Sequence, residues 1–241
     1  MSKIALVTGA NKGIGFETSR QLAQQGVHVI MASRDAAKGA AAAAKLKSQK
    51  LDVESIALDV SVAASIAAAA KEIESKYGKL DILVNNAGAD AGAAGKGASQ
   101  QTMEAWRKTF DTNFFGLVAV TQAFMPLLKK APAGRIVNVS SILGSLAMHS
   151  DPKSPIYGVQ LATYNVSKSA VNSYTVQLAY ELRDTAIKVN AVHPGHVKTD
   201  MGGPSAPMEL EDGAKTGVAM ALIGPDGPTG SYTHLGQTLP W

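Results

Sequence analysis

A tyrosine and a lysine that stand four residues apart, Tyr164 and Lys168, could work together as an acid–base pair. In a helix this spacing places both side chains on one face, one turn apart. The pKa of an unperturbed tyrosine is about 10, so its phenol exchanges protons poorly at neutral pH. A neighbouring ammonium favours the phenolate and is expected to lower that pKa. An isolated pair of this type is more often an ordinary helix-surface pair, so the assignment depends on the rest of the chain.

Two consecutive serines, Ser140 and Ser141, follow a short apolar run that is typical of a strand. Loops at the carboxyl ends of parallel strands form the ligand crevice of open α/β sheets. A serine hydroxyl at such a place could polarise the carbonyl group of a substrate. Capping of a helix or turn is an equally ordinary role for serine, so this argument leaves both roles open.

A glycine-rich turn follows the first apolar run, and a helical pattern begins directly after it. Glycines allow a tight turn and let backbone amides approach a pyrophosphate, while a helix N-terminus offers unpaired N–H donors. The spacing departs from the G-x-G-x-x-G pattern, and a lone glycine turn is also compatible with a plain strand-to-helix connection. The residues predicted to form a phosphate cradle are Gly9, Asn11, Lys12, Gly13, Ile14 and Gly15.

The end of the second apolar run bears on which dinucleotide is bound. Enzymes that use NAD place an acid there to accept the 2′-hydroxyl of the adenine ribose, whereas a cation accommodates the 2′-phosphate of NADP. Ser33 occupies the position of the acid, and Arg34 follows it. Lys12 is a second cation that could reach the phosphate, and Asp35 is more simply explained as a helix N-cap. The charges therefore favour NADP(H) over NAD(H).

The elements that must position these residues are short apolar runs alternating with longer stretches rich in alanine, lysine and glutamate. This alternation predicts parallel strands joined by crossover helices, in a sheet covered on both faces. We expect one α/β domain over residues 1–241, with a doubly wound, mostly parallel, Rossmann-like sheet. The predicted strands are Lys3–Thr8, His28–Ala32, Ser55–Ala57, Ile82–Asn85, Arg135–Val139, Lys188–Val192 and a weaker one near Ser231–Leu235. The predicted helices are Gly15–Gln25, Ala36–Lys47, Ala63–Tyr77, Met103–Lys129 and Ala162–Arg183.

The composition excludes several classes of function. The chain has 241 residues, of which 46% are hydrophobic and 17% charged, and a formal net charge of +4. Its basic residues are scattered, which argues against a nucleic-acid partner. It has no cysteine, and His193 and His196 lack carboxylate companions, so we predict no metal site. No apolar run approaches the roughly 18 residues needed to cross a bilayer, and no signal-peptide pattern is present, so we expect a cytoplasmic protein without a membrane partner.

Further segments, taken in order, resemble the short-chain dehydrogenase/reductase family, and in particular its NADPH-dependent carbonyl reductases. The turn that ends at Gly15 resembles the family's T-G-x-x-x-G-x-G, and the other matching segments are Asn85-Asn86-Ala87-Gly88, Asn113, Ser141, Tyr164-Asn165-Val166-Ser167-Lys168 and Pro194-Gly195-His196-Val197-Lys198-Thr199. The match covers nearly the whole chain.

The resemblance implies a role for each matching residue. The implied catalytic residues are Asn113, Ser141, Tyr164 and Lys168. It aligns Ser141 rather than Ser140 with the catalytic serine and implies that Asn113 holds a water of the proton path, although a buried structural amide is an equal reading of Asn113. The further implied cofactor contacts are Asp59, Val60, Asn86, Ala87, Gly88, Tyr164, Lys168, Pro194, Gly195, Val197 and Thr199.

The chain departs from the family pattern between Ser141 and Tyr164. Roughly ten extra residues enter the loop at about 146–159, beside the predicted crevice where substrate choice is made. The insertion contains Tyr157, which has no lysine four residues later. Residues 202–212 correspond to the family's substrate-binding region and are expected to form a small lid. The apolar side chains expected to form a pocket are Met201, Met208, Leu210, Leu146, Met148, Ile156 and Val159.

Together these features predict an oxidoreductase that transfers hydride from NADPH to the carbonyl group of a ketone or aldehyde, or oxidises the alcohol in reverse. The alternative is a non-catalytic NADP-binding sensor or scaffold on the same fold, because a fold does not fix function. An epimerase or dehydratase of the family is disfavoured, because few residues follow Thr199 to form a separate substrate-binding portion. The expected partner is a small carbonyl or alcohol substrate, and the resemblance leaves both a monomer and a homo-oligomer open.

Overall fold

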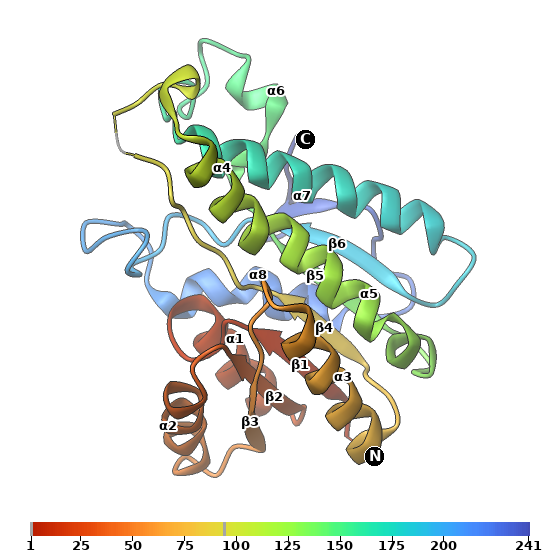
Figure 1. Ribbon diagram of the computed structural model, residues 1–241. Coiled ribbons are helices and arrows are strands. Elements are labelled where there is room, and N and C mark those ends of the chain that lie inside the picture. The colour runs from red at the N-terminus through yellow and green to blue at the C-terminus, as the bar shows by residue number, and fades with distance from the viewer. Residues whose placement is uncertain (1, 94) are drawn as a thin grey trace.

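One eight-stranded sheet organises the computed structural model, which describes residues 2–93 and 95–241 (Figure 1). The strand order is β3-β2-β1-β4-β5-β6-β7-β8, and all neighbours pair in parallel except the antiparallel pair β7–β8. This order confirms the predicted doubly wound, mostly parallel α/β fold. The strands are β1 (Ile4–Thr8), β2 (His28–Ser33), β3 (Val53–Ala57), β4 (Ile82–Asn85), β5 (Arg135–Val139), β6 (Lys188–Val192), β7 (Tyr232–His234) and β8 (Gln237–Thr238).

The central strands are buried along their whole length, as in β1, β4 and β5. Successive side chains of a strand point to opposite faces, so neighbouring residues enter different cores. Leu6 of β1 packs in one hydrophobic cluster and Val7 in the other. A sheet buried in this way needs helices on both faces, which explains why its strands are nearly continuous apolar runs.

Helices cover the sheet in two layers. The cluster containing Val7 also receives Leu22, Leu46 and Ala221 from α1 (Gly13–Gln24), α2 (Ala36–Lys47) and α8 (Leu210–Leu222). The opposite layer consists of α3 (Ala63–Tyr77), α5 (Gly116–Lys129) and α7 (Ala162–Glu181), which lie together over the strands in Figure 1. Within the residues that the structure describes, no helix is both long and apolar enough to traverse a membrane.

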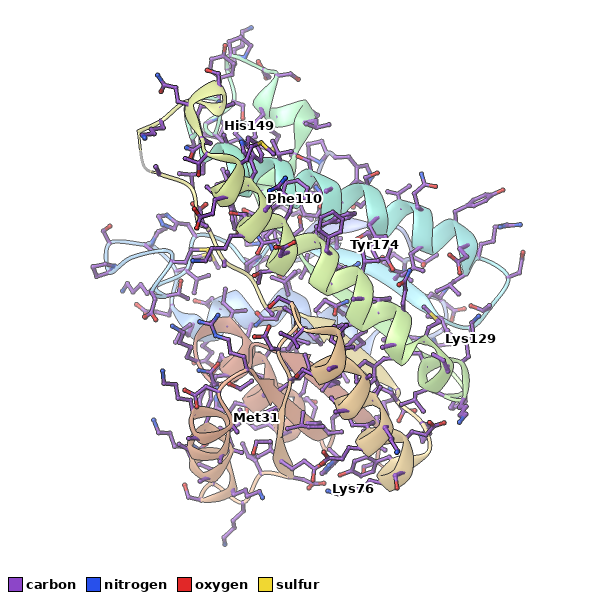
Figure 2. All side chains as sticks on the ribbon, viewed as in Figure 1. Met31, Lys76, Phe110, Lys129, His149 and Tyr174 are labelled. Atoms are coloured by element: carbon purple, nitrogen blue, oxygen red, sulfur yellow. The ribbon has the colours of Figure 1, made fainter. Side chains whose placement is uncertain are left out.

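The predicted helix over Met103–Lys129 is confirmed in its bounds, but it contains a π segment that the sequence did not predict. Helix α4 (Met103–Phe110) passes into a five-residue π segment (Asp111–Phe115) before α5 begins. At Gly116 the backbone lies so close to Val60 that a Cβ would be 2.8 Å from the Val60 carbonyl oxygen. Contacts of this kind join residues that are far apart in the sequence, so the helical periodicity does not reveal them. Figure 2 shows Phe110, at the end of α4, near Tyr174 of α7, and the ring of Phe114 lies 6.1 Å and 6.3 Å from these two rings.

The segment expected to be a lid over residues 202–212 needs correction at its end, because α8 already begins at Leu210. The buried face of α8 consists mainly of small residues, so it lacks the apolar stripe that predicts a helix. These small residues permit close packing: a Cβ on Gly213 would lie 2.6 Å from Val197. The inserted segment also contains a short helix, α6 (Leu146–His149), that the sequence did not predict.

Candidate active site

Two loops meet between β1 and β4, where the strand order reverses. Thr8 Oγ1 accepts hydrogen bonds from the backbone N–H groups of Asn86 (2.9 Å) and Ala87 (3.0 Å). The Asn86 side chain donates in return to the Thr8 carbonyl oxygen at 2.8 Å. In open α/β sheets the ligand crevice lies at this point, outside the carboxyl ends of the strands. The structure thus places Asn86, Ala87 and Gly88 beside the glycine turn.

The three glycines of the turn are required for different reasons. Gly9 and Gly13 have φ angles of +64° and +58°, in the left-handed region that favours glycine. Gly15 is required by space, because a Cβ there would lie 2.4 Å from Asn86 Nδ2 and 2.6 Å from the Gly9 carbonyl oxygen. A Cβ on Gly13 would meet only Thr199, at 3.7 Å, so this part of the turn is open on the ligand side.

The N-terminus of α1 completes the cradle. No side chain in the described ranges caps the helix, and its first turn contains no acidic residue. The first N–H groups of a helix have no partner within it and carry a partial positive charge. Asn11 and Ile14, both half-buried, flank this end of the helix. The donors and the free space therefore suit the pyrophosphate of a dinucleotide.

Lys12 is engaged elsewhere than at the predicted phosphate position. Its ammonium pairs with the carboxylate of Asp200, just after Thr199, and both side chains are exposed. An exposed ion pair stabilises a protein by only about 0–1 kcal/mol, so it can exchange for another anion. A contact between Lys12 and the 2′-phosphate of NADP requires this pair to open.

Arg34 is exposed at the end of β2, close to the loop after β3. Two hydrogen bonds from Ser61 lower the pKa of Asp59, and the charge of Arg34 adds to the effect, so Asp59 and Arg34 share one neighbourhood. Ser33 is buried and donates to the Asp35 carbonyl oxygen at 3.0 Å. Asp35 accepts the N–H of Lys38 at 3.0 Å, which confirms its predicted role as the N-cap of α2. An exposed guanidinium at position 34 and no acid at position 33 match the requirements of a 2′-phosphate.

Three of the four predicted catalytic residues come together at the start of α7. Lys168 Nζ lies 5.6 Å from the centre of the Tyr164 ring and donates to the Val139 carbonyl oxygen at 2.7 Å. The hydroxyl of Ser141 lies within hydrogen-bonding reach of the Tyr164 phenol and acts on its pKa. Ser140 instead donates to Asn172 at 2.6 Å, away from the phenol. The geometry therefore favours Ser141 over Ser140 as the serine that touches a substrate.

The pKa of the phenol moves in the opposite direction from the one expected. Burial raises the pKa of Tyr164 to about 12, the bond with Ser141 opposes this change, and the charge of Asp90 adds to it. The Lys168 ammonium is directed at Val139, and burial lowers its own pKa to about 8. At neutral pH the phenol keeps its proton, which is the form that a proton donor needs.

Asn113 lies in the π segment and is buried. Its side chain donates to the Ala89 carbonyl oxygen (2.8 Å) and to Ser167 Oγ (2.9 Å) and accepts the Ala89 N–H (2.7 Å). A Cβ on the adjacent Gly88 would lie 3.6 Å from Asn113 Oδ1 and 3.8 Å from Lys168 Nζ. The Asn113 side chain thus connects the loop after β4 to α7, next to Lys168.

His193 links two loops of the site, a role that the sequence did not reveal. Its Nδ1 accepts the N–H of Ile142 at 3.1 Å and that of Gly195 at 3.3 Å. Burial, with a smaller effect of His234, lowers the pKa of His193 to about 3, so the ring is neutral and Nδ1 can accept. Through this one nitrogen, His193 connects the loop that contains Ser141 and Ile142, the serine loop, to the turn at Pro194–Gly195. That turn was predicted to lie beside the nicotinamide.

The remaining predicted contacts lie in the loop after β6. Gly195 has a φ of +95°. The Val197 side chain is buried against Gly213, so its backbone is the part left to face a ligand. Thr199 Oγ1 accepts the Gly202 N–H at 2.9 Å and thereby bends the chain toward the 202–209 segment.

Three of the apolar side chains predicted to form a substrate pocket have different surroundings in the structure. Met208 packs against Gly195, and Met201 is 54% exposed. Leu146 lines a shallow cavity of about 120 Å³ with Trp241 and Val176. Tyr157 is 45% exposed in the inserted loop. Over residues 2–93 and 95–241, no group of side chains is arranged to hold a metal ion.

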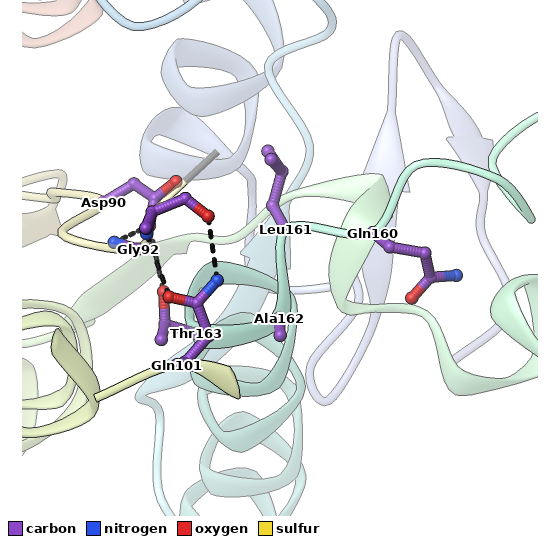
Figure 3. A pocket seen from close by; sticks show the side chains of 8 residues that line it. Asp90, Gly92, Gln101, Gln160, Leu161, Ala162 and Thr163 are labelled. Carbon is purple, nitrogen blue, oxygen red and sulfur yellow. Dashed lines mark hydrogen bonds between the residues drawn. The ribbon is translucent and has the colours of Figure 1, made fainter. Parts of the chain in front are cut away.

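A small cavity of about 50 Å³ lies beside the start of α7 (Figure 3). Its lining combines polar and apolar residues, namely Asp90, Gly92, Ala93, Gln101, Gln160, Leu161, Ala162 and Thr163. Thr163 Oγ1 donates to Asp90 Oδ1 at 3.0 Å. Asp90 was not among the predicted site residues. The one signal in the sequence was the position of Asp90, two residues after the motif that ends at Gly88.

Comparison with known proteins agrees with this geometry. The sequence profile of the family described as short chain dehydrogenase matches residues 3–210. The chain is 35% identical to a (+)-neomenthol dehydrogenase of Arabidopsis thaliana, and the match covers 92% of each protein. It is also 35% identical to carbonyl reductase (NADPH) 1 of Mus musculus, over 99% of this chain and 98% of that protein.

Solved structures are similar over their full length. A carbonyl reductase from chicken fatty liver, solved with NADPH bound, superposes with a TM-score of 0.86 at 28% identity, covering 100% of this chain and 99% of that one. Salutaridine reductase from Papaver somniferum superposes with a TM-score of 0.84 at 31% identity, covering 95% of this chain and 99% of that one.

Proposed function

This chain belongs to the short chain dehydrogenase family, and on that premise we propose that it is an NADPH-dependent carbonyl reductase, which converts a ketone or aldehyde into an alcohol. The observation that carries the proposal is the meeting of Ser141, Tyr164 and Lys168 beside an open glycine cradle. A protein that only bound the dinucleotide would not need a serine hydroxyl beside a protonated phenol at this place.

The residues of the crevice fit NADPH, which supplies the hydride when bound. The amides of the glycine turn and of α1 would hold the pyrophosphate, and Arg34 the 2′-phosphate. The adenosine would be bound by Asp59, Val60, Asn86, Ala87 and Gly88, and the nicotinamide half by Tyr164, Lys168, Pro194, Gly195, Val197 and Thr199.

The side chains of the site have separate roles in the rest of the proposed reaction. The Ser141 hydroxyl and the Tyr164 phenol hold the carbonyl oxygen, and the phenol gives its proton to that oxygen as negative charge develops on it. The Lys168 ammonium stabilises the phenolate that remains. His193 keeps the serine loop and the turn at Gly195 in register, because both donate to the same nitrogen.

The two pKa values place the active form near neutrality. Below pH 8 Lys168 is charged, and up to about pH 12 Tyr164 is protonated. Carbonyl reduction needs both forms. We therefore expect the rate of reduction to decline as the pH rises through about 8, where Lys168 loses its charge.

The finer features form part of the same proposal. The enzyme oxidises alcohols when NADP⁺ is in excess, it works in the cytoplasm, and the resemblance allows both a monomer and a homo-oligomer. The inserted segment 146–159 and the loop 202–209 border the substrate, within a single domain that spans residues 1–241.

The test is a panel of ketones and aldehydes with the purified protein, in which the loss of NADPH absorbance is followed and the alcohol is identified by chromatography. We expect turnover with several members of the panel and a much lower rate with NADH. Tight binding of NADPH without turnover of any carbonyl would instead support the non-catalytic reading.

A further inference from the structure

Asp90 presents a carboxylate beside the proposed catalytic tyrosine. It lies in the loop after β4 and lines the small cavity at the start of α7 (Figure 3). Its Oδ1 accepts hydrogen bonds from Thr163 Oγ1 at 3.0 Å and from the Gly92 N–H at 2.9 Å. These bonds fix the carboxylate at the start of α7, where Thr163 directly precedes Tyr164 and the charge of Asp90 acts on the phenol.

The loop that carries Asp90 is fixed on both sides. Asn113 makes two hydrogen bonds to the backbone of Ala89, and Thr109 Oγ1 accepts the N–H of Ala91 at 3.1 Å. At Gly92 a Cβ would lie 2.6 Å from Thr163 Oγ1, so the loop is pressed against α7. The position of the Asp90 carboxylate is therefore set by the fold.

The charge of Asp90 is not neutralised in the described part of the chain. Its Oδ2 makes no hydrogen bond there, and the carboxylate belongs to no ion pair. The Lys168 ammonium is buried and donates to Val139. The side chain of Asp90 is exposed, so an incoming substrate can reach it. The charge already acts on the site, because it contributes to the raised pKa of Tyr164.

We infer that Asp90 selects carbonyl substrates that carry a positively charged nitrogen. Oδ1 is used to fix the side chain, and Oδ2 remains to attract a cation that is attached to the same molecule as the carbonyl group. The inference rests on the proposed function, because it names the substrate class of that site. Because opposite charges a few ångströms apart near a protein surface attract one another, we expect the cationic ketone to be preferred by about tenfold.

The experiment compares two ketones that differ only in charge. One is a methyl ketone with a trimethylammonium group at the end of a short alkyl chain, and the other carries a tert-butyl group in its place. The quaternary nitrogen cannot titrate, so its charge is constant. The ratio of the two kcat/KM values is measured for the wild type and for Asp90→Asn, at low and high salt and with a shorter and a longer chain.

Asp90→Asn removes the charge but keeps an oxygen that can accept from Thr163 and Gly92. We expect the ratio of cationic to neutral ketone to fall by about tenfold in this variant, and in the wild type to fall with added salt as the attraction is screened. Any change common to both ketones, such as one in the pKa of Tyr164, cancels in the ratio. Asp184→Asn is the matched control, since it removes one exposed charge just after the far end of α7 and should leave the ratio unchanged.

The outcomes separate the inference from the proposed function. If both ketones are reduced and Asp90→Asn leaves their ratio unchanged at every chain length, the inference is overturned while the carbonyl reductase stands. If Asp184→Asn lowers the ratio as much as Asp90→Asn does, net charge is responsible and the inference is also overturned. If the wild type oxidises NADPH neither in the presence of these ketones nor with any other carbonyl compound, the proposed function is wrong. The inference is then wrong as well.

Discussion

The cofactor side and the substrate side of the crevice are built differently. On the cofactor side, the glycine turn packs so tightly that a Cβ on Gly15 would collide with Asn86 and Gly9. On the substrate side, Leu146 is 68% exposed and Met201 54% exposed. The first region gains its shape from buried neighbours, whereas the second consists of surface loops with few of them. A rigid cradle beside adaptable loops allows one reaction to be kept while the substrate changes.

The largest effect should come from the residue between these two regions. Tyr164→Phe removes one hydroxyl from a helix face, so the fold and the binding of NADPH should persist. Proton donation is lost, and we expect the rate of carbonyl reduction to fall by about 10²–10⁴-fold. Single-turnover oxidation of NADPH measures the rate, and fluorescence titration measures binding of the cofactor.

Tyr157→Phe is the matched control for this loss. Its side chain lies in the inserted loop, and position 161 is Leu161 rather than a lysine, so only a modest change in activity is expected. Near-full turnover in Tyr164→Phe together with loss of turnover in Tyr157→Phe would show that the active site has been assigned to the wrong tyrosine.

The tight packing of the cofactor side can be broken with one methyl group. Gly15→Ala should destabilise the protein by about 1–3 kcal/mol, because the added carbon overpacks the contact between α1 and the loop after β4. Gly217→Ala in α8 is the control, since its Cβ would meet only Thr18, at 3.9 Å, and alanine favours a helix. Urea unfolding of both variants tests the comparison, which would be weakened if both lost stability equally.

The preference for NADPH or NADH tests whether the residues that bind the cofactor act separately from those proposed to carry out the reduction. Arg34→Ala should raise KM for NADPH about ten- to a hundredfold, because a hydrogen bond to a charged group contributes about 1.5–3 kcal/mol. The value of kcat at saturating cofactor should change little, since the contact is remote from the reacting carbon. Ser33→Asp combined with Arg34→Leu should reverse the preference toward NADH. Equal kcat/KM for the two cofactors in the wild type would contradict the charge argument.

The smallest effect at neutral pH concerns His193, which joins the two sides. Its pKa is about 3 in the folded protein, against about 6.5 in an unfolded chain. Between these values the unfolded state binds a proton that the folded state does not, so stability falls as the pH drops from about 6.5 toward 3. His193→Asn keeps an acceptor but does not titrate. Denaturation at several pH values should therefore show a weaker loss in the variant; parallel curves would exclude His193 as a cause.

The sequence predicted those parts of the molecule that depend on neighbours along the chain. The strand, glycine turn and helix of the cradle are contiguous, and the cap at Asp35 involves residues three apart. The pair at Tyr164 and Lys168 shares one helix turn. Strand positions were also predicted, since a strand buried on both faces is a nearly continuous apolar run. Helix periodicity, turn chemistry and charge were enough for these features.

Contacts between distant residues decided the rest. Asp90 and Thr163 are 73 positions apart, and Ile142 and His193 are 51 apart, so no local pattern marks either pair. The same cause explains the π segment at Asn113 and the helix α8, whose small buried residues fit neighbours instead of forming an apolar stripe. It also explains why burial governs the pKa of Tyr164, since desolvation depends on everything packed around the phenol. The sequence determined which groups we propose to react, and only the tertiary structure decided what surrounds them.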